Sequence, residues 1–304
     1  MSTIDAHHHV WDLSVRDQPW LDQPQLAPIR RNFLLSDLEP QAAAHGVTET
    51  VVVQTVAEPD ETPELLALAE ASDLVAGVVG WVDLEGAGAA DALAALRELP
   101  GGDRLVSIRH PVLIETDPDW LARPSVLRGL AAVAAAGLCY DVVVMPEQLR
   151  GAVVAAAAIP ELTFVLDHLG NPDVEGWAGG PVGGTVAESW TQAIADFAGR
   201  PNTVAKLSGV LGELAPPSAD PVAGADGASI AHIRPYYEIA LAGFGPQRLM
   251  FGSDWPVSTI SVGYDGVYAA ATSLTADLSA SEKAAIFTET ARSTYGLGAT
   301  PRSR

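Results

Sequence analysis

Near its N-terminus the chain reads Ile4-Asp5-Ala6-His7-His8-His9-Val10-Trp11, three consecutive histidines between apolar residues. Alternate side chains of a β-strand point to the same side, so His7 and His9 share one face and His8 points to the other. Two imidazoles that converge at one strand end can bind a divalent metal ion or polarise a substrate carbonyl group. The apolar flanks argue against a tag remnant, and we interpret the stretch as the first strand of the fold.

Short runs rich in β-branched residues recur along the chain, separated by Ala- and Leu-rich segments with helical spacing. The predicted strands are residues 3–10, 49–56, 75–83, 105–112, 138–145, 162–168, 203–210 and 248–254. The predicted helices are residues 35–45, 62–71, 89–99, 125–136, 147–159, 186–198 and 233–244, and a last helix that follows the capping-box spacing Ser279-Ala280-Ser281-Glu282 and runs to Tyr295.

Eight alternating strand and helix units within 304 residues predict an α/β fold, a (β/α)8 TIM barrel that forms a single domain over residues 1–304. A doubly wound sheet is the alternative. Against it, no Gly-x-Gly-x-x-Gly follows the first strand, and polar residues follow many strands instead of two. Long connections follow strands 1, 6 and 7, at residues 12–32, 170–185 and 212–230. They leave the end of the barrel that carries active sites, so we expect them to form walls or lids of a pocket.

The composition excludes several classes of partner. The formal net charge is −21, and such an acidic surface repels nucleic acid and anionic membranes. The only cysteine, Cys139, can form no intramolecular disulfide, which fits a reducing compartment. We see no secretory signal, and the most membrane-like window, residues 126–145, carries Arg128 and Asp141. We therefore expect a cytoplasmic protein with a small-molecule substrate. No pattern indicates its oligomeric state.

Polar residues recur at the predicted C-terminal ends of the strands. Ionised side chains in apolar surroundings are costly unless they are paired or bound to metal, so one shared polar site explains this recurrence better than many separate structural roles. Asp167 precedes His168 on the sixth strand, and we expect it to point to the other face as a structural hydrogen-bond acceptor. The residues at the strand ends, in chain order, are His7, His9, Gln54, Arg109, His110, Tyr140, Asp141, His168, Lys206, Ser208, Asp254 and Trp255.

Five motifs stand at these strand ends: Asp-Ala-His-His-His-Val-Trp-Asp (5–12), Ser-Ile-Arg-His (107–110), Leu-Asp-His-Leu-Gly-Asn-Pro (166–172), Lys-Leu-Ser-Gly (206–209) and Phe-Gly-Ser-Asp-Trp-Pro (251–256). In this order they resemble the amidohydrolase superfamily. More narrowly, they resemble the amidohydrolase-2 group of sugar lactonases, which includes L-fuconolactonase- and L-rhamnonolactonase-like enzymes. The resemblance covers nearly the whole chain, and it implies a distorted barrel that hydrolyses a small lactone at the C-terminal ends of the strands.

The resemblance also implies roles for individual residues. His7 and His9 match the histidine pair of the first strand, and His168 matches the histidine of the sixth. Asp254 matches the aspartate of the eighth strand that activates water. We therefore expect Asp254, His168, His7 and His9 to be catalytic, with Asp254 as base and then acid, and the histidines or a metal ion they hold as stabilisers of the oxyanion.

The sequence departs from the fuller metal pattern of the superfamily in two places. Members with a complete site have a histidine on the fifth strand, where this chain has Tyr140-Asp141. Many binuclear members have a bridging lysine or glutamate on the fourth, where this chain has Arg109-His110. We therefore do not expect a binuclear site. Two alternatives stay open: a metal-free site, as in some related lactonases, or one Zn²⁺-like ion on His7, His9 and Asp254 with His168 or Asp141 nearby.

Several further residues are candidates for substrate binding. Arg109 and His110 offer charged hydrogen bonds to a hydroxyl or carboxylate, although Arg109 fits equally well an ion pair with Asp141 or another acid at the barrel mouth. Lys206 either reaches the substrate or neutralises an acid in the site. A tryptophan ring suits the apolar face of a sugar. The complete set is Arg109, His110, Gln54, Lys206, Trp255 and Trp20.

These observations favour a hydrolase that opens a small carboxylic lactone, such as a sugar aldonolactone, by attack of an activated water. A metal-dependent decarboxylase of a small aromatic or unsaturated acid is the alternative within enzymes, because the same superfamily branch contains decarboxylases with a His-x-His start. A non-catalytic barrel that binds a small ligand is the alternative from another class.

Overall fold

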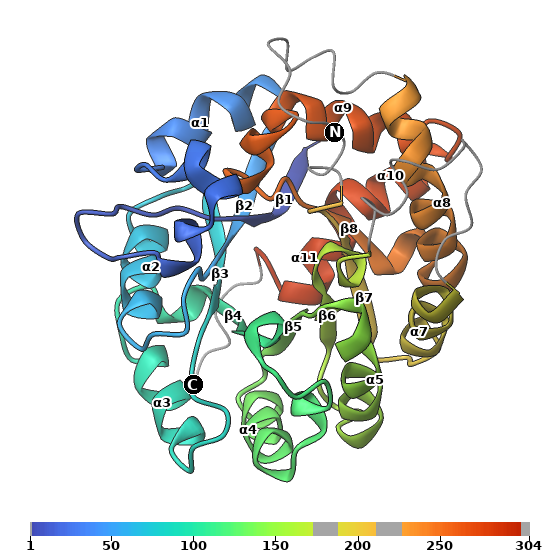
Figure 1. Ribbon diagram of the computed structural model, residues 1–304. Coiled ribbons are helices and arrows are strands. Elements are labelled where there is room, and N and C mark those ends of the chain that lie inside the picture. The colour runs from blue at the N-terminus through green and yellow to red at the C-terminus, as the bar shows by residue number, and fades with distance from the viewer. Residues whose placement is uncertain (1, 173–187, 211–226, 299–304) are drawn as a thin grey trace.

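The computed structural model describes residues 2–172, 188–210 and 227–298. Eight parallel strands form one sheet in chain order, and helices surround it (Figure 1). This arrangement is the (β/α)8 TIM barrel predicted from the sequence. The strands are β1 (Thr3–His8), β2 (Val47–Val53), β3 (Val75–Gly80), β4 (Leu105–Pro111), β5 (Cys139–Val143), β6 (Phe164–Leu166), β7 (Thr203–Leu207) and β8 (Leu249–Phe251).

The helices fill most of the segments in which the sequence predicts them. One helix, α9, was not predicted, because Gly263 and Gly266 are poor helix formers in its first turn. Its buried face, which includes Tyr264, Val267 and Leu274, explains why packing outweighs this weak propensity. The helices are α1 (Leu35–Ala44), α2 (Glu61–Glu70), α3 (Ala89–Arg97), α4 (Pro124–Ala135), α5 (Leu149–Ala158), α7 (Glu188–Ala198), α8 (Gly227–Phe244), α9 (Gly263–Leu274), α10 (Ala280–Ala284) and α11 (Thr290–Tyr295).

The barrel closes between β8 and β1. The backbone N–H of Asp254 donates to the carbonyl of His7 at 2.8 Å, and that of His9 donates to the carbonyl of Trp255 at 2.7 Å. Gly252 makes this approach possible, because a Cβ at that position would lie 2.7 Å from the Cβ of His7. The closure therefore sets Asp254 beside the two histidines of the first strand.

The barrel is distorted, as expected. β6 and β8 have only three residues each, and the register between β1 and β2 shifts. Of the three long connections, residues 12–32 contain two short 3-10 helices, at Pro19–Asp22 and Pro24–Ile29. Most of the predicted connections 170–185 and 212–230 lies outside the described residues.

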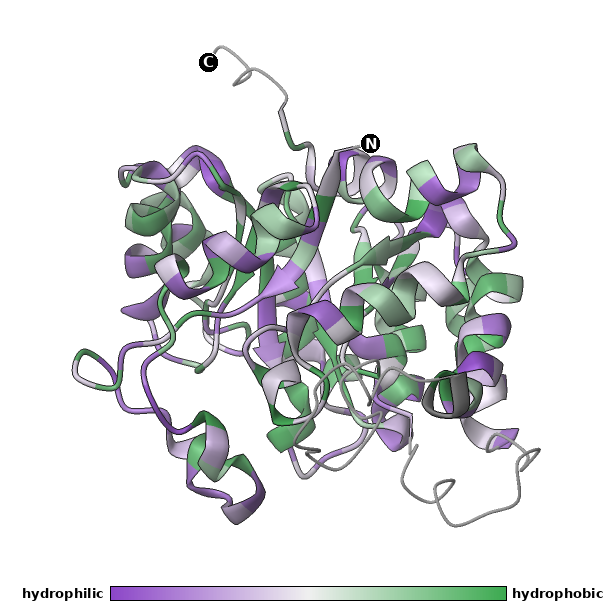
Figure 2. Cartoon of the chain, turned by 90° about the horizontal axis from the view of Figure 1, so that it is seen from above, coloured by the Kyte–Doolittle hydropathy of each residue, from purple (hydrophilic) through white to green (hydrophobic). Residues whose placement is uncertain are grey.

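The two ends of the barrel differ. At the N-terminal end of the strands, α11 packs against the barrel, and Tyr295 donates a hydrogen bond to the carboxylate of Asp141 at 2.9 Å. The barrel interior is not purely apolar, since Asp141, Asp167 and Lys206 are all fully buried in it. Figure 2 likewise shows hydrophilic segments among the strands at the middle of the molecule. These charges lie beneath the C-terminal ends of the strands, where the candidate site is found.

No helix in the described part of the chain combines the length and the apolar character needed to cross a membrane.

Candidate active site

His7 and His9 lie on one side of the first strand, as its alternation predicts. Their Nε2 atoms are 3.2 Å apart at the C-terminal end of β1. His8 points the other way, and its Nε2 lies 3.0 Å from the hydroxyl of Thr50 on β2. Only two of the three consecutive histidines therefore face the interior of the barrel.

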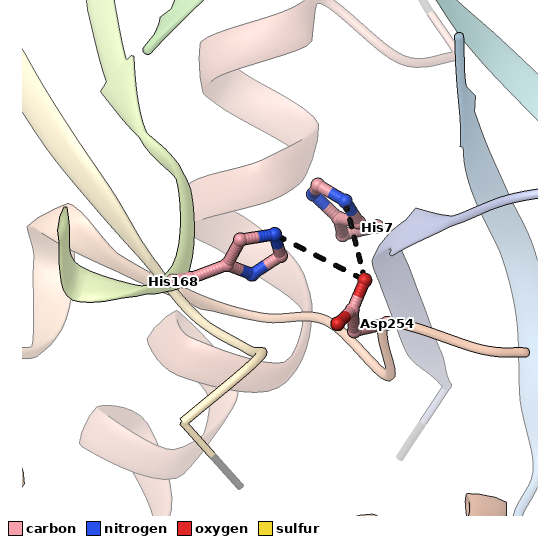
Figure 3. A group of neighbouring side chains, drawn as sticks. All are labelled: His7, His168 and Asp254. Carbon is pink, nitrogen blue, oxygen red and sulfur yellow. Dashed lines mark ion pairs between the residues drawn. The ribbon is translucent and has the colours of Figure 1, made fainter. Parts of the chain in front are cut away.

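His168 and Asp254 reach the same place through unusual backbone conformations. The φ angle is 54° at His168 and 53° at Asp254, in the left-handed region that non-glycine residues seldom adopt. His168 belongs to the 3-10 turn η7 (Asp167–Gly170), which begins directly after β6. Such conformations persist where the surrounding structure enforces them and are concentrated at functional sites. Here they turn both side chains toward His7 (Figure 3).

Four side chains converge on one point. Oδ1 of Asp254 lies 3.6 Å from Nε2 of His9, 3.7 Å from Nε2 of His7 and 3.9 Å from Nε2 of His168. The rings of His7 and His168 are 4.5 Å apart, and all four residues are buried. The structure thus brings together the four residues that the sequence predicts to be catalytic.

These atoms fit a single metal ion in two overlapping sets of three, which share His7 and Asp254. In a tetrahedral zinc site with bonds of about 2.0–2.1 Å, neighbouring ligand atoms are about 3.3–3.4 Å apart. The separations among Nε2 of His7, Nε2 of His9 and Oδ1 of Asp254, 3.2–3.7 Å, are close to that value. The ligand atoms of His7, His168 and Asp254 all lie within 4.8 Å of one another. Imidazoles and a carboxylate are also donors typical of zinc, so these residues form a candidate metal site.

The imidazoles of His9 and His168 are each hydrogen-bonded through Nδ1, the nitrogen that faces away from Asp254. Nδ1 of His9 lies 2.8 Å from the carbonyl oxygen of Val53, which can only accept. The proton of His9 is therefore on Nδ1, and its Nε2 lone pair faces the site. Nδ1 of His168 lies 2.9 Å from the hydroxyl of Ser208. Burial lowers the pKa of His168, and the nearby Asp254 only partly opposes this.

The imidazole of His7 contacts a buried network of charged side chains through Nδ1. Its Nδ1 lies 3.2 Å from the ammonium of Lys206 and 3.3 Å from Oδ1 of Asp167. Lys206 also contacts Asp141 at 2.5 Å and Asp167 at 3.0 Å. Burial lowers the pKa of His7 well below its ordinary value. Burial raises the pKa of Asp141. For Asp167 burial acts in the same direction, but Lys206, His7 and Arg109 outweigh it and hold the pKa well below its usual range.

The expectation that Asp167 points away from the site was wrong. The strand alternation on which it rested ends at Leu166, and the turn η7 that follows places Asp167 and His168 both inside the barrel. Asp167 is fully buried against His7 and Lys206. It also accepts a hydrogen bond from Arg109 at 3.1 Å.

Arg109 is oriented by Asp167 and Gln54. One terminal nitrogen of Arg109 donates to Asp167, and the other donates to the carbonyl and the side-chain oxygen of Gln54, at 2.5 and 2.9 Å. Its acidic partner is therefore Asp167 and not Asp141. The Nε of Arg109 is buried and has no hydrogen-bond partner among the described residues. Gln54 is itself fully buried.

His110 is engaged on both ring nitrogens. The indole N–H of Trp81 donates to Nδ1 at 3.1 Å, so the proton of neutral His110 is on Nε2 and points to Glu115 at 2.8 Å. The ring also stacks on Trp120 with centroids 4.3 Å apart. His110 therefore has no free nitrogen for a ligand in this arrangement.

The two candidate tryptophans differ in exposure. Trp255 is 1% exposed and packs edge-on against Phe33, so its ring presents no open face. Trp20 is partly exposed and contacts Trp11 with centroids 5.4 Å apart. Lys206, like Trp255, is fully buried.

Glu61 was not singled out from the sequence. Its carboxylate accepts hydrogen bonds from the backbone N–H of Thr55 at 2.9 Å and that of Val56 at 3.0 Å. It thereby fixes the turn that follows Gln54. An acidic residue in the first turn of a helix, here α2, is a weak signal for such a role.

Comparisons with known proteins place the chain in a family. The amidohydrolase family model matches residues 4–297, and the chain belongs to this family. It is 35% identical over 267 residues to an L-fucono-1,5-lactonase of Burkholderia ambifaria, covering 88% of this chain and 84% of that protein. It is 34% identical over 296 residues to an L-fucono-1,5-lactonase of Burkholderia multivorans, covering 97% and 96%.

Solved structures agree with this assignment. An amidohydrolase of Burkholderia multivorans with bound zinc has a TM-score of 0.86 and 33% identity, covering 98% of this chain and 100% of that one. Two decarboxylases of the same fold share 14% and 11% identity with the chain, a likeness that shows the fold alone.

Proposed function

We propose that this protein is a lactonase that opens a sugar lactone by attack of an activated water at the ends of β1, β6 and β8. The observation that carries the proposal is the convergence of Asp254 with His7, His9 and His168 at separations of 3.6–3.9 Å. The relatives named L-fucono-1,5-lactonase support a sugar lactone as the substrate class.

Asp254 is the proposed general base. Its carboxylate takes a proton from water while the water oxygen attacks the lactone carbonyl carbon. The bond between the carbonyl carbon and the ring oxygen then breaks, and Asp254 returns the proton to the leaving alkoxide. The product is one hydroxy acid, so atoms and protons balance. The left-handed backbone at Asp254 holds the carboxylate beside the three imidazoles throughout.

The histidines are proposed to stabilise the negative charge that develops on the carbonyl oxygen, His7 and His168 by donating an Nε2–H and His9, whose Nε2 carries a lone pair, by helping to hold a metal ion. They lie in buried surroundings, where fixed dipoles and charges act more strongly than in water. We also propose that they hold one zinc ion together with Asp254, supported by the 3.2–3.7 Å separations among His7, His9 and Asp254 and by the nearness of His168 to His7 and Asp254. Bound zinc supplies Lewis-acid polarisation of a carbonyl group and makes water more acidic.

Arg109 is the proposed substrate-binding cation. Its guanidinium is held by Asp167 and Gln54, and its Nε–H keeps a free hydrogen bond that suits a substrate hydroxyl or carboxylate. We retain Trp20 as a candidate for an apolar sugar face. To Gln54, His110, Lys206 and Trp255 we assign supporting roles, because protein groups already engage the polar atoms of the first three and Phe33 packs against the ring of Trp255.

Three broader expectations remain proposals of the same kind. One domain over residues 1–304 is supported by the family match to residues 4–297. A small molecule as the partner is supported by the lactonase relatives. The cytoplasmic location rests on the sequence alone.

The test is a panel of sugar 1,4- and 1,5-lactones, including L-fucono-1,5-lactone, with acid release followed by a pH indicator. We expect hydrolysis of at least one lactone well above the buffer rate. Folded protein without activity on the panel contradicts the proposal. Release of carbon dioxide from hydroxybenzoates would favour the decarboxylase alternative, and tight lactone binding without turnover would favour the binding barrel.

A further inference from the structure

The Nδ1 atom of His7 has two neighbours of opposite character. The ammonium of Lys206, at 3.2 Å, can only donate a hydrogen bond, and Oδ1 of the ionised Asp167, at 3.3 Å, can only accept one. Neutral imidazole carries one N–H, so His7 cannot satisfy both neighbours at once. Its proton is either on Nε2, with Lys206 donating to Nδ1, or on Nδ1, donating to Asp167.

The first arrangement completes a chain of hydrogen bonds. Lys206 donates to Nδ1 of His7, and the Nε2–H of His7 donates to Nε2 of His9 at 3.2 Å. The Nδ1–H of His9 donates to the carbonyl of Val53 at 2.8 Å. In this series of hydrogen bonds, from Lys206 to Val53, each N–H named has an acceptor. His7 then presents an N–H to the site and has no lone pair to offer a cation.

The second arrangement suits a cation. With the proton of His7 on Nδ1, the Nε2 lone pairs of His7 and His9 both face Asp254. Histidines that bind metal generally donate their other N–H to a carboxylate or carbonyl group, and Asp167 is placed for that role. Oδ1 of Asp167 is buried and, in the present side-chain orientations, accepts no hydrogen bond of good geometry from a described residue, neither from Lys206 at 3.0 Å nor from His7 at 3.3 Å. It is therefore free to accept one from His7.

Both neighbours are held firmly. Lys206 is fixed by Asp141, which in turn accepts hydrogen bonds from Ser107 at 2.6 Å and Tyr295 at 2.9 Å. Asp167 is fixed through its other oxygen by Arg109. Because neither can move away, the competition for Nδ1 is decided by what His7 meets on its Nε2 side.

We propose that Lys206 and Asp167 are positioning residues that set the tautomer of His7, Lys206 supporting a hydrogen-bonding form of the site and Asp167 a form that binds a divalent cation. His7 stays neutral in both forms: one proton leaves Nε2 to water and another joins Nδ1 from water. The inference rests on the proposed metal site and not on the lactone reaction.

Nitrogen-15 NMR of the full chain labelled in histidine reads the tautomer directly. The His7 signals are assigned by their loss in the His7→Gln variant. We expect the proton on Nε2 in chelator-treated protein and on Nδ1 after addition of zinc. A proton on Nδ1 under both conditions overturns the role of Lys206, and a proton on Nε2 under both, or no zinc binding at all, overturns the role of Asp167.

Zinc affinity, measured by competition with a chromophoric chelator, tests Asp167 separately. We expect Asp167→Asn to weaken zinc binding about 10- to 100-fold, the range seen for such supporting residues. Tyr295→Phe is the matched control, because it removes a buried hydrogen bond of the same network without touching His7, and it should leave zinc affinity unchanged. Equal losses in the two variants contradict the proposal. If Asp167→Asn fails to fold, the NMR comparison of the wild-type chain with and without zinc still tests the role of Asp167.

Neither measurement uses a lactone. Lack of lactonase activity would therefore overturn the proposed function and leave this inference standing, and the reverse also holds.

Discussion

The imidazole of His168 lies against the backbone of Gly209 so closely that a Cβ on Gly209 would stand 2.5 Å from the ring Cγ and Nδ1. Gly209 also has a φ angle of 60°, which side-chain-bearing residues seldom adopt. The segment that follows β7 thus supports the ring of His168, and the hydroxyl of Ser208 in this segment is hydrogen-bonded to the ring's Nδ1. The position of His168 depends on the absence of a side chain at residue 209.

Gly209→Ala is therefore expected to displace His168 from Asp254. A misplacement of about 1 Å can cost about 100-fold in rate, so we expect kcat/KM for lactone hydrolysis to fall by about 10- to 100-fold. Gly137→Ala is the matched control, because Gly137 has a similar φ of 69° but no atom within 4 Å of an added Cβ. Steady-state kinetics, together with thermal melts, separate the displacement of His168 from a general loss of stability. Equal loss of activity in both variants would show that backbone strain alone is responsible.

Removal of metal is expected to lower thermal stability. A ligand that binds only the folded state stabilises it by about 2.7 kcal/mol at 100 times its Kd. Zinc should therefore raise the Tm of chelator-treated protein by several degrees in differential scanning calorimetry. In His168→Asn the shift should shrink markedly, and asparagine is chosen because it tolerates the left-handed φ of 54°. An equal shift in both proteins would mean that zinc binds elsewhere.

His110 is expected to make stability depend on pH. Burial lowers its pKa, opposed by Glu115, and the Trp81 N–H occupies the lone pair on Nδ1. On acidification, His110 therefore binds a proton more readily in the unfolded chain than in the folded chain. This contribution to stability is present above the ordinary pKa of histidine and is lost as the pH falls below it.

Urea unfolding at pH 7 and pH 5 checks this effect. Wild-type protein should lose more free energy of unfolding on acidification than His110→Gln, which cannot titrate. Other buried histidines contribute equally to both proteins, so the difference isolates His110. Identical losses would contradict the assigned hydrogen bonds of His110.

Much of the site follows from local sequence patterns. The shared face of His7 and His9 was predicted because strand alternation holds to the end of β1. The order of the eight strands was predicted because the β-branched runs and helical segments alternate without interruption. The meeting of His168 with Asp254 was expected from the common end of parallel strands.

The other features of the site depend on backbone conformations and long-range contacts that sequence periodicity does not predict. Asp167 was assigned to the wrong face, because the strand ends one residue before it and a left-handed residue follows. The pairing of Arg109 with Asp167 joins β4 to the turn after β6, and no spacing in the sequence specifies it. The burial of Trp255 likewise depends on its contact with Phe33, a residue that follows the connection 12–32 and is distant in the sequence.

The most direct test of the account is the rate of L-fucono-1,5-lactone hydrolysis by Asp254→Asn beside that of wild type. Asparagine keeps the shape of the side chain and tolerates the φ of 53°, so the variant should fold with an unchanged circular dichroism spectrum. Loss of a general acid–base is expected to lower kcat by about 100- to 10,000-fold, with binding of the hydroxy-acid product retained. A folded variant that hydrolyses the lactone within a few-fold of the wild-type rate would contradict the central role of Asp254.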